Sequence, residues 1–200
     1  MKHLLFILFA TAVSAQPTRP TAPAGLTTFF ISFPATQSQL PLDGRVLLIL
    51  AKTDKPEPRQ QVSDAIETAQ LFGVDVNGLK PGQTAVVDAG AFGYPKRSLR
   101  DLQAGDYYVQ AVLHKYEMFL VKNGPNGTRR AVKLPMDRGE GQNWRTAPGN
   151  LFSKPQKITL KAGTKQSFTL VMNQVNPLIQ EPKNTKFINC LLYTSPSPRD

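Results

Sequence analysis

The chain has 200 residues, 24 of them basic and 14 acidic, so its formal net charge is +10; it contains one cysteine and two histidines. A single cysteine excludes an internal disulfide, and the lack of GxxxxGK[ST], GxGxxG and CxxC patterns argues against nucleotide, dinucleotide and thiol-redox chemistry. The length suits one domain with a hydrophobic core.

Residues 1–15 have the pattern of a signal peptide. Lys2 and His3 give a basic start, an apolar run follows, and Val13-Ser14-Ala15 matches the small-x-small cleavage pattern, with Gln16 as the mature start. The apolar run is shorter than the ~20 residues of a membrane-spanning helix. We therefore expect an exported protein, secreted or periplasmic, without stable membrane insertion; the alternative is a buried N-terminal strand or helix. Residues 16–25, rich in proline and threonine, are expected to be an extended leader.

Residues 26–176 are expected to form one all-β domain, an antiparallel β-sandwich of immunoglobulin-like or transthyretin-like type. Short runs of β-branched and aromatic residues alternate there with clusters of glycine, proline, asparagine and aspartate, as in sandwiches. The predicted strands are Leu26–Phe33, Arg45–Lys52, Leu71–Val76, Thr84–Asp88, Asp106–Val121, Arg130–Leu134, Gln156–Lys161 and Gln166–Met172.

The segment Ser98–Leu120 is the strongest structural signal. A turn at Ala104-Gly105-Asp106 leads into a long strand rich in tyrosine, valine and leucine, which predicts the middle of the sandwich. The strands at 157–161 and 166–172 are separated by a short Ala-Gly connector, which predicts a hairpin. Residues 61–72 place Val62, Ile66 and Ala69 at helical spacing, which predicts one short helix.

Candidate catalytic residues are few. After removal of the signal peptide His114 is the one histidine, and no GxSxG turn presents a nucleophilic serine, so we expect a strand histidine with a local hydrogen bond. Asp137 and Glu140 lie in a glycine-rich loop beside Trp144 and offer a sugar or Ca²⁺ site; the alternative, a turn neutralised by Arg138 and Arg145, is preferred because calcium-loop spacing is absent. No catalytic, cofactor-binding or metal-binding residue is predicted.

The positive charge is concentrated in one part of the chain. Residues 16–121 carry ten basic and ten acidic residues, whereas residues 122–165 carry ten basic residues against two acidic ones. Such a region attracts anionic partners, for example acidic polysaccharide or an acidic neighbouring domain; a solvated face without function is the alternative. Nucleic acid fits an exported chain without interleaved aromatic residues poorly. The predicted interaction face comprises Arg129, Arg130, Lys133, Arg138, Trp144, Arg145, Lys154 and Lys157.

Several long motifs carry a family resemblance. YPKRSLRDLQAGDYYVQAVLHKYEMF, KLPMDRGEGQNW and PGNLFSKPQKITL resemble the N-terminal region of large secreted bacterial esterases of the α/β-hydrolase superfamily, and the likeness spans most of residues 31–187. In those proteins a β-sandwich precedes the hydrolase domain. The resemblance implies that residues 177–189 are a linker toward a hydrolase domain that this sequence does not contain, so none of the family's catalytic residues falls on this chain.

The last eleven residues differ in character. Residues 190–200, CLLYTSPSPRD, resemble translated read-through of a cloning adapter, and the alternative is a genuine disordered tail. We therefore expect a truncated, non-catalytic accessory domain that docks a missing hydrolase domain. The second hypothesis is an independent module that binds glycans or a cell surface and recognises acidic polysaccharide, with Tyr107, Tyr108 or Trp144 as a stacking platform.

Overall fold

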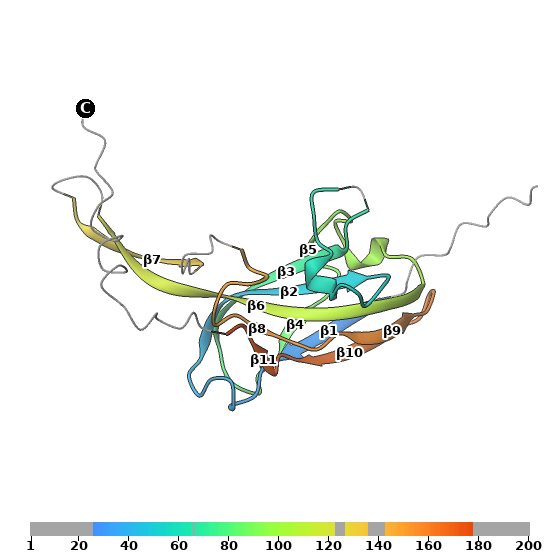
Figure 1. Cartoon of the computed structure of the whole chain (residues 1–200), viewed down its shortest axis with the longest axis horizontal. Coiled ribbons are helices and arrows are strands. Elements are labelled where there is room, and N and C mark those ends of the chain that lie inside the picture. Colours follow the sequence, from blue (N-terminus) through green and yellow to red (C-terminus); the bar gives the residue numbers. More distant parts are fainter. Residues whose placement is uncertain (1–25, 66, 123–126, 136–142, 178–200) are drawn as a thin grey trace, which may run out of the picture.

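The computed structural model describes residues 26–65, 67–122, 127–135 and 143–177. The predicted signal peptide, leader, tail and most of the linker lie outside these ranges, as do Asp137, Arg138 and Glu140. The described residues form eleven strands and two 3-10 helices (Figure 1). Their bounds are β1 Thr27–Ser32, β2 Leu42–Ala51, η1 Pro58–Gln60, β3 Gln70–Leu79, β4 Ala85–Val87, β5 Phe92–Tyr94, η2 Leu99–Asp101, β6 Gly105–Lys122, β7 Arg129–Pro135, β8 Leu151–Phe152, β9 Gln156–Leu160, β10 Gln166–Val171 and β11 Gln174–Val175.

The strands form two sheets with one core between them. The larger sheet has the order β11-β8-β6-β2-β3-β5, with β7 and β9 also paired to β6, and the smaller sheet has the order β10-β1-β4. Every pair is antiparallel except β1 with β10, which is parallel. The all-β sandwich predicted from the sequence is confirmed, and the parallel pair is an exception to its antiparallel pattern.

Alternation along the strands explains the core. Phe29 and Ile31 of β1 face Leu48 of β2 and Val109 and Leu113 of β6 inside one buried cluster. Each large apolar side chain removed from water contributes about 1.5–3 kcal/mol. A second cluster lies on the outer face of the larger sheet. Because β2 contributes to both clusters, it is apolar at consecutive positions. The buried members of the second cluster are Leu47, Ile49, Ala51, Ala69 and Val112, and they pack against Val62, Leu71, Trp144 and Phe152.

The 18-residue strand β6 is central to the larger sheet. It begins after η2, whose capping box is closed by the side chains of Ser98 and Asp101. Four strands pair with it, β2, β7, β8 and β9. The prediction that this segment lies in the middle of the sandwich is confirmed for residues 105–115, whereas residues 116–120 extend beyond the body.

β6 is longer than the body of the sandwich. Its pairing with β2 ends at Gly44 and Lys115, and from Tyr116 onward its partner is β7. We call residues 116–122 and 129–135 the arm; it is a two-stranded ribbon that projects from the body (Figure 1). At its base the strands approach so closely that a Cβ on Gly44 would collide with the carbonyl oxygen of His114.

Two local predictions were wrong, and three short strands were missed. Residues 61–65 and 67–69 form no helix, because Val62 and Ala69 pack into the second cluster from an irregular segment between η1 and β3. β9 and β10 do not form a hairpin, since β9 pairs with β6 in the larger sheet and β10 with β1 in the smaller one. The short strands β5, β8 and β11 were not predicted from the sequence.

Candidate functional site

The basic residues predicted to form one interaction face occupy three separate places. Arg129, Arg130 and Lys133 lie on β7 in the arm. Trp144 and Arg145 lie in the segment that leads to β8, and Lys154 and Lys157 flank the start of β9. Lys157 is opposite Tyr108 of β6, so at ~3.3 Å per residue it lies about 26 Å along that strand from the base of the arm. Arg138 lies outside the described residues.

Two of these cations have carboxylate partners. The Nζ of Lys133 is 3.0 Å from Asp43 Oδ2 and also donates to Asn77 Oδ1, which ties the arm to β2 and β3. The Nζ of Lys157 is 3.3 Å from Asp106 Oδ2. Hydrogen bonds from Lys133 and from the Gly78 amide lower the pKa of Asp43, so this carboxylate stays charged at neutral pH.

Trp144 and Arg145 are built into the body. Trp144 packs against the second cluster, and the Arg145 guanidinium lies 5.2 Å from the Trp144 ring centroid and donates to the carbonyl group of Val62. Tyr107 is buried, with the Nζ of Lys52 3.4 Å from its ring centroid. Tyr107 therefore offers no open ring face for stacking on a sugar.

A network of buried polar groups joins the base of the arm to the end of the described chain. Asn150, 2% exposed, accepts from the Lys115 amide through Oδ1 at 3.0 Å and donates through Nδ2 to the Trp144 carbonyl at 3.0 Å. Its own carbonyl accepts from the Asn176 amide at 2.9 Å. One side chain therefore connects β6, the Trp144 segment and the chain exit.

Asn176 completes the network on the exit side. It is 4% exposed, and its Nδ2 donates to the carbonyl groups of Arg145 and Ala147 at 3.0 and 3.1 Å. Its Oδ1 accepts from the Arg59 guanidinium at 2.8 Å, and Arg59 also stacks on Phe152 at 3.7 Å from its ring centroid. We call Asn150, Asn176 and Arg59 the exit lock.

His114 lies next to the exit lock but shows no catalytic pairing. The residue is 8% exposed, and its buried Nε2 has no hydrogen-bond partner among the described residues, unlike the local hydrogen bond that we expected. Its ring meets Tyr116 edge-on at 6.1 Å. Burial lowers the His114 pKa, so the imidazole is neutral at pH 7.

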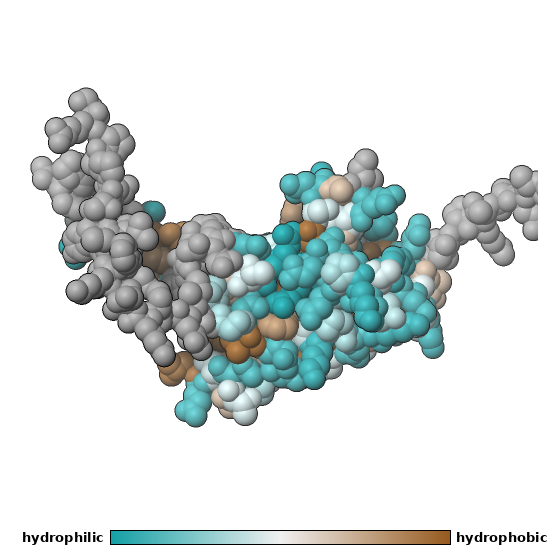
Figure 2. Space-filling model, in the orientation of Figure 1, coloured by the Kyte–Doolittle hydropathy of each residue, from teal (hydrophilic) through white to brown (hydrophobic). Residues whose placement is uncertain are grey.

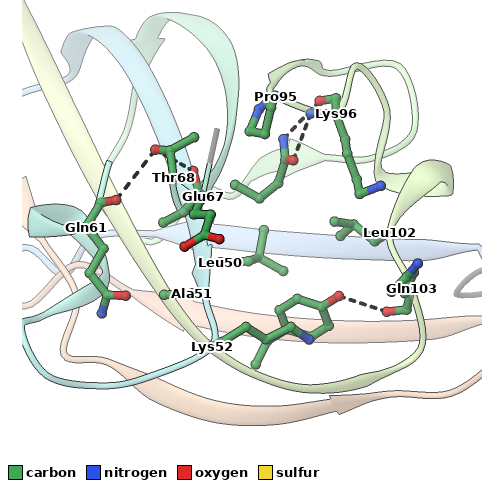
Figure 3. A pocket seen from close by; sticks show the side chains of 13 residues that line it. Leu50, Ala51, Lys52, Gln61, Glu67, Thr68, Pro95, Lys96, Leu102 and Gln103 are labelled. Atoms are coloured by element: carbon green, nitrogen blue, oxygen red, sulfur yellow. Dashed lines mark hydrogen bonds between the residues drawn. The ribbon is translucent and has the colours of Figure 1, made fainter. Parts of the chain in front are cut away.

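A pocket of about 330 Å³ opens at the far end of β6 from the arm. Leu50, Ala51 and Leu102 contribute its apolar lining, and Glu67 and Lys96 reach into it from different segments (Figure 3). The buried Gln70 side chain braces one wall, donating to the Tyr94 and Lys96 carbonyls at 2.8 and 2.9 Å. Its described lining includes no histidine, cysteine or serine.

The exit lock could not be predicted from local sequence patterns. Asn150 and Asn176 occur in segments rich in glycine, proline and asparagine, which are typical of solvated turns. Their burial depends on three segments that are distant in the sequence and meet only in the fold. A buried asparagine in such a segment cannot be told from a surface one by local pattern.

Two searches of the described residues gave negative results. No group of three or more histidine, cysteine, aspartate or glutamate side chains is placed to hold a metal ion in the ranges that the structure covers. None of the helices in those ranges has the length and apolar character for crossing a membrane. Comparisons of the chain with protein-family models, curated proteins and solved structures found no match.

Proposed function

We propose that this chain is a non-catalytic docking domain of an exported protein and that it positions a domain that follows Pro177 in the same polypeptide. The partner proposed is an α/β-hydrolase domain with esterase activity, on the strength of the resemblance described above. The proposed location is the periplasm or the exterior of a bacterial cell.

The observation that carries this proposal is the exit lock. The last residues of a domain usually fray because few contacts hold them. Here Asn176 is held by Arg59 and by the carbonyl groups of Arg145 and Ala147. A satisfied buried polar network favours a single geometry, so the chain leaves the body at a fixed position and in a fixed direction. A fixed exit is what a docking domain needs in order to orient the domain attached to it.

Binding of acidic polysaccharide, the alternative function, has less support. Lys133 and Lys157 are paired with carboxylates, Arg145 lies within the body, and Tyr107 is buried. Of the described cations of the predicted face, Arg129 and Arg130 on the arm and Lys154 before β9 remain, and they lie in two distant parts of the molecule. Retention of the chain on a heparin column at physiological salt would favour this alternative.

The test of the proposed function is the natural gene read past the codon for Asn189. We expect a hydrolase domain to follow, and we expect the extended protein but not the 200-residue chain to hydrolyse a chromogenic short-chain ester. Turnover by the 200-residue chain would show that it is itself an enzyme. A stop codon directly after Asn189 would remove the partner domain and with it the proposed function.

A further inference from the structure

The arm exposes large apolar side chains on both of its faces. Met118 and Leu120 are 59% and 66% exposed on one face, and Phe119 and Leu134 are 39% and 43% exposed on the other. Figure 2 shows hydrophobic surface on the arm, at the left of the view, whereas the visible face of the body is mainly hydrophilic. Side chains of this size and number, close together on a projecting element, are typical of an interaction surface.

Among the described residues, none of the other strands pairs with the arm or forms a second layer over these side chains. Its two strands pair with each other from Tyr116 opposite Pro135 to Lys122 opposite Arg129. Each face of such a ribbon is buried only when another part of a protein packs against it. A two-stranded ribbon by itself is only marginally stable in water. We therefore expect a bound partner to stabilise the arm.

The charges of the arm indicate the chemistry of that partner. Arg129 and Arg130 are adjacent and exposed at the start of β7, Lys133 further along that strand is already paired with Asp43, and Glu117 is the one acidic residue of the arm. A second copy docked arm to arm would place these cations against each other, which is unfavourable. A surface with an apolar centre and carboxylates at its margin complements the arm in both respects.

The exit of the chain lies beside the arm. Val175 of β11 pairs with Leu151 of β8, and Leu151 pairs with Leu113 of β6, three residues before the arm begins. Two strand spacings of ~4.8 Å put the exit about 10 Å from β6. The linker to a domain attached after Pro177 therefore starts next to the arm, which keeps that domain at a high effective concentration there.

We infer that the arm is the contact surface for the domain that follows Pro177, which rests on the function proposed above, and that this domain meets it with an apolar patch bordered by carboxylates. The arm and the exit lock then act together. The lock fixes where the linker to the following domain begins, and the arm supplies apolar area that is buried when that domain docks.

The inference is tested in the full-length chain. The double variant M118S/L120S removes the most exposed apolar side chains of the arm, and V86S/V171S, on β4 and β10, is the matched control because these valines are 45% and 43% exposed away from the arm. In the full-length protein we expect the arm amides to exchange hydrogen at least tenfold more slowly than in the 200-residue chain. We expect M118S/L120S to abolish that protection and to lower the melting temperature of the docked protein by about 2–8 °C.

The outcomes separate the two proposals. If the two domains unfold together but M118S/L120S behaves like V86S/V171S, the arm is not the contact surface, although the docking function stands. If the two domains unfold independently in the wild type, or no domain follows, both proposals fail. If the slowing of hydrogen exchange in the arm grows with protein concentration, the occupant is a second copy of the chain. If it appears only with anionic vesicles, the occupant is a lipid surface. Either result overturns the inference.

Discussion

Asn150 serves three partners at once, through both ends of its side chain and through its carbonyl group. A hydrophobic side chain of similar size cannot replace Asn150, because the Lys115 amide and the Trp144 carbonyl would both lose their hydrogen bonds. At the scale of single residues, the exit of the chain therefore depends on amide side chains that carry no charge.

Replacement of Asn150 by alanine is expected to lower the free energy of unfolding by about 1–3 kcal/mol, since two part-buried backbone groups lose their partners. Asn173→Ala is the control, because Asn173 is exposed and lies three residues from Asn176. Urea denaturation at pH 7 measures both variants. Equal stability of Asn150→Ala and Asn173→Ala would show that the exit lock contributes little.

His114 is expected to make stability depend on pH. Burial lowers its pKa below the ordinary value of 6.5, so below that pH the unfolded chain takes up a proton that the folded chain resists. The contribution of neutral His114 to the free energy of unfolding is therefore present above pH 6.5 and is lost as the pH falls toward 5. The urea midpoint of the wild type should fall from pH 7.5 to pH 5 more steeply than that of His114→Phe. Parallel slopes for the two proteins would contradict this expectation.

At the scale of elements, an ion pair reaches from β7 of the arm to β2 of the body. Lys133 contacts Asp43 there, and Asp43 also accepts a hydrogen bond from the Gly78 amide at 2.6 Å. Because the Asp43 pKa is below its ordinary value of 3.8, the pair persists at neutral pH and is lost only as the pH falls below about 4.

Asp43→Asn is expected to loosen the arm while keeping the Gly78 hydrogen bond. A partly exposed pair of this kind stabilises by up to about 1 kcal/mol, so trypsin cleavage at Arg129 and Arg130 should be about 2–5 times faster in the variant at pH 7. Asp75→Asn is the control, since it breaks the exposed Arg45–Asp75 pair between β2 and β3. Cleavage at the wild-type rate in Asp43→Asn would show that the pair does not hold the arm.

Alternation of apolar residues predicted eight strands but not all of their partners. In β9, Ile158 and Leu160 point to the core, and in β10 Leu170 does so, as the period of two requires. The two strands face each other across that core from different sheets, which the pattern within each strand cannot reveal. β8 and β11 are two residues long, too short for any period to show.

At the scale of the whole molecule, the concentration of charge in residues 122–165 did not translate into one face. Those residues lie in the arm, in the segment around Trp144 and in β9. The arm strand β7 and β9 pair with different parts of β6, and Trp144 packs over the outer face of the sheet. Charge counted along a chain becomes a surface field only after folding has placed the residues. The fold class was predictable because it depends on local patterns, whereas the site depends on segments that meet only in three dimensions.

The position of β1 has a consequence for folding during synthesis. β1 lies between β4 and β10, and Thr27 near the start of the domain pairs with Gln166 near its end. The smaller sheet therefore cannot close until almost the whole domain has left the ribosome, and such non-local pairing folds slowly. The last strands of the domain therefore decide when its first strand can be buried, and β1 stays without either of its partners in register until β4 and then β10 have been made.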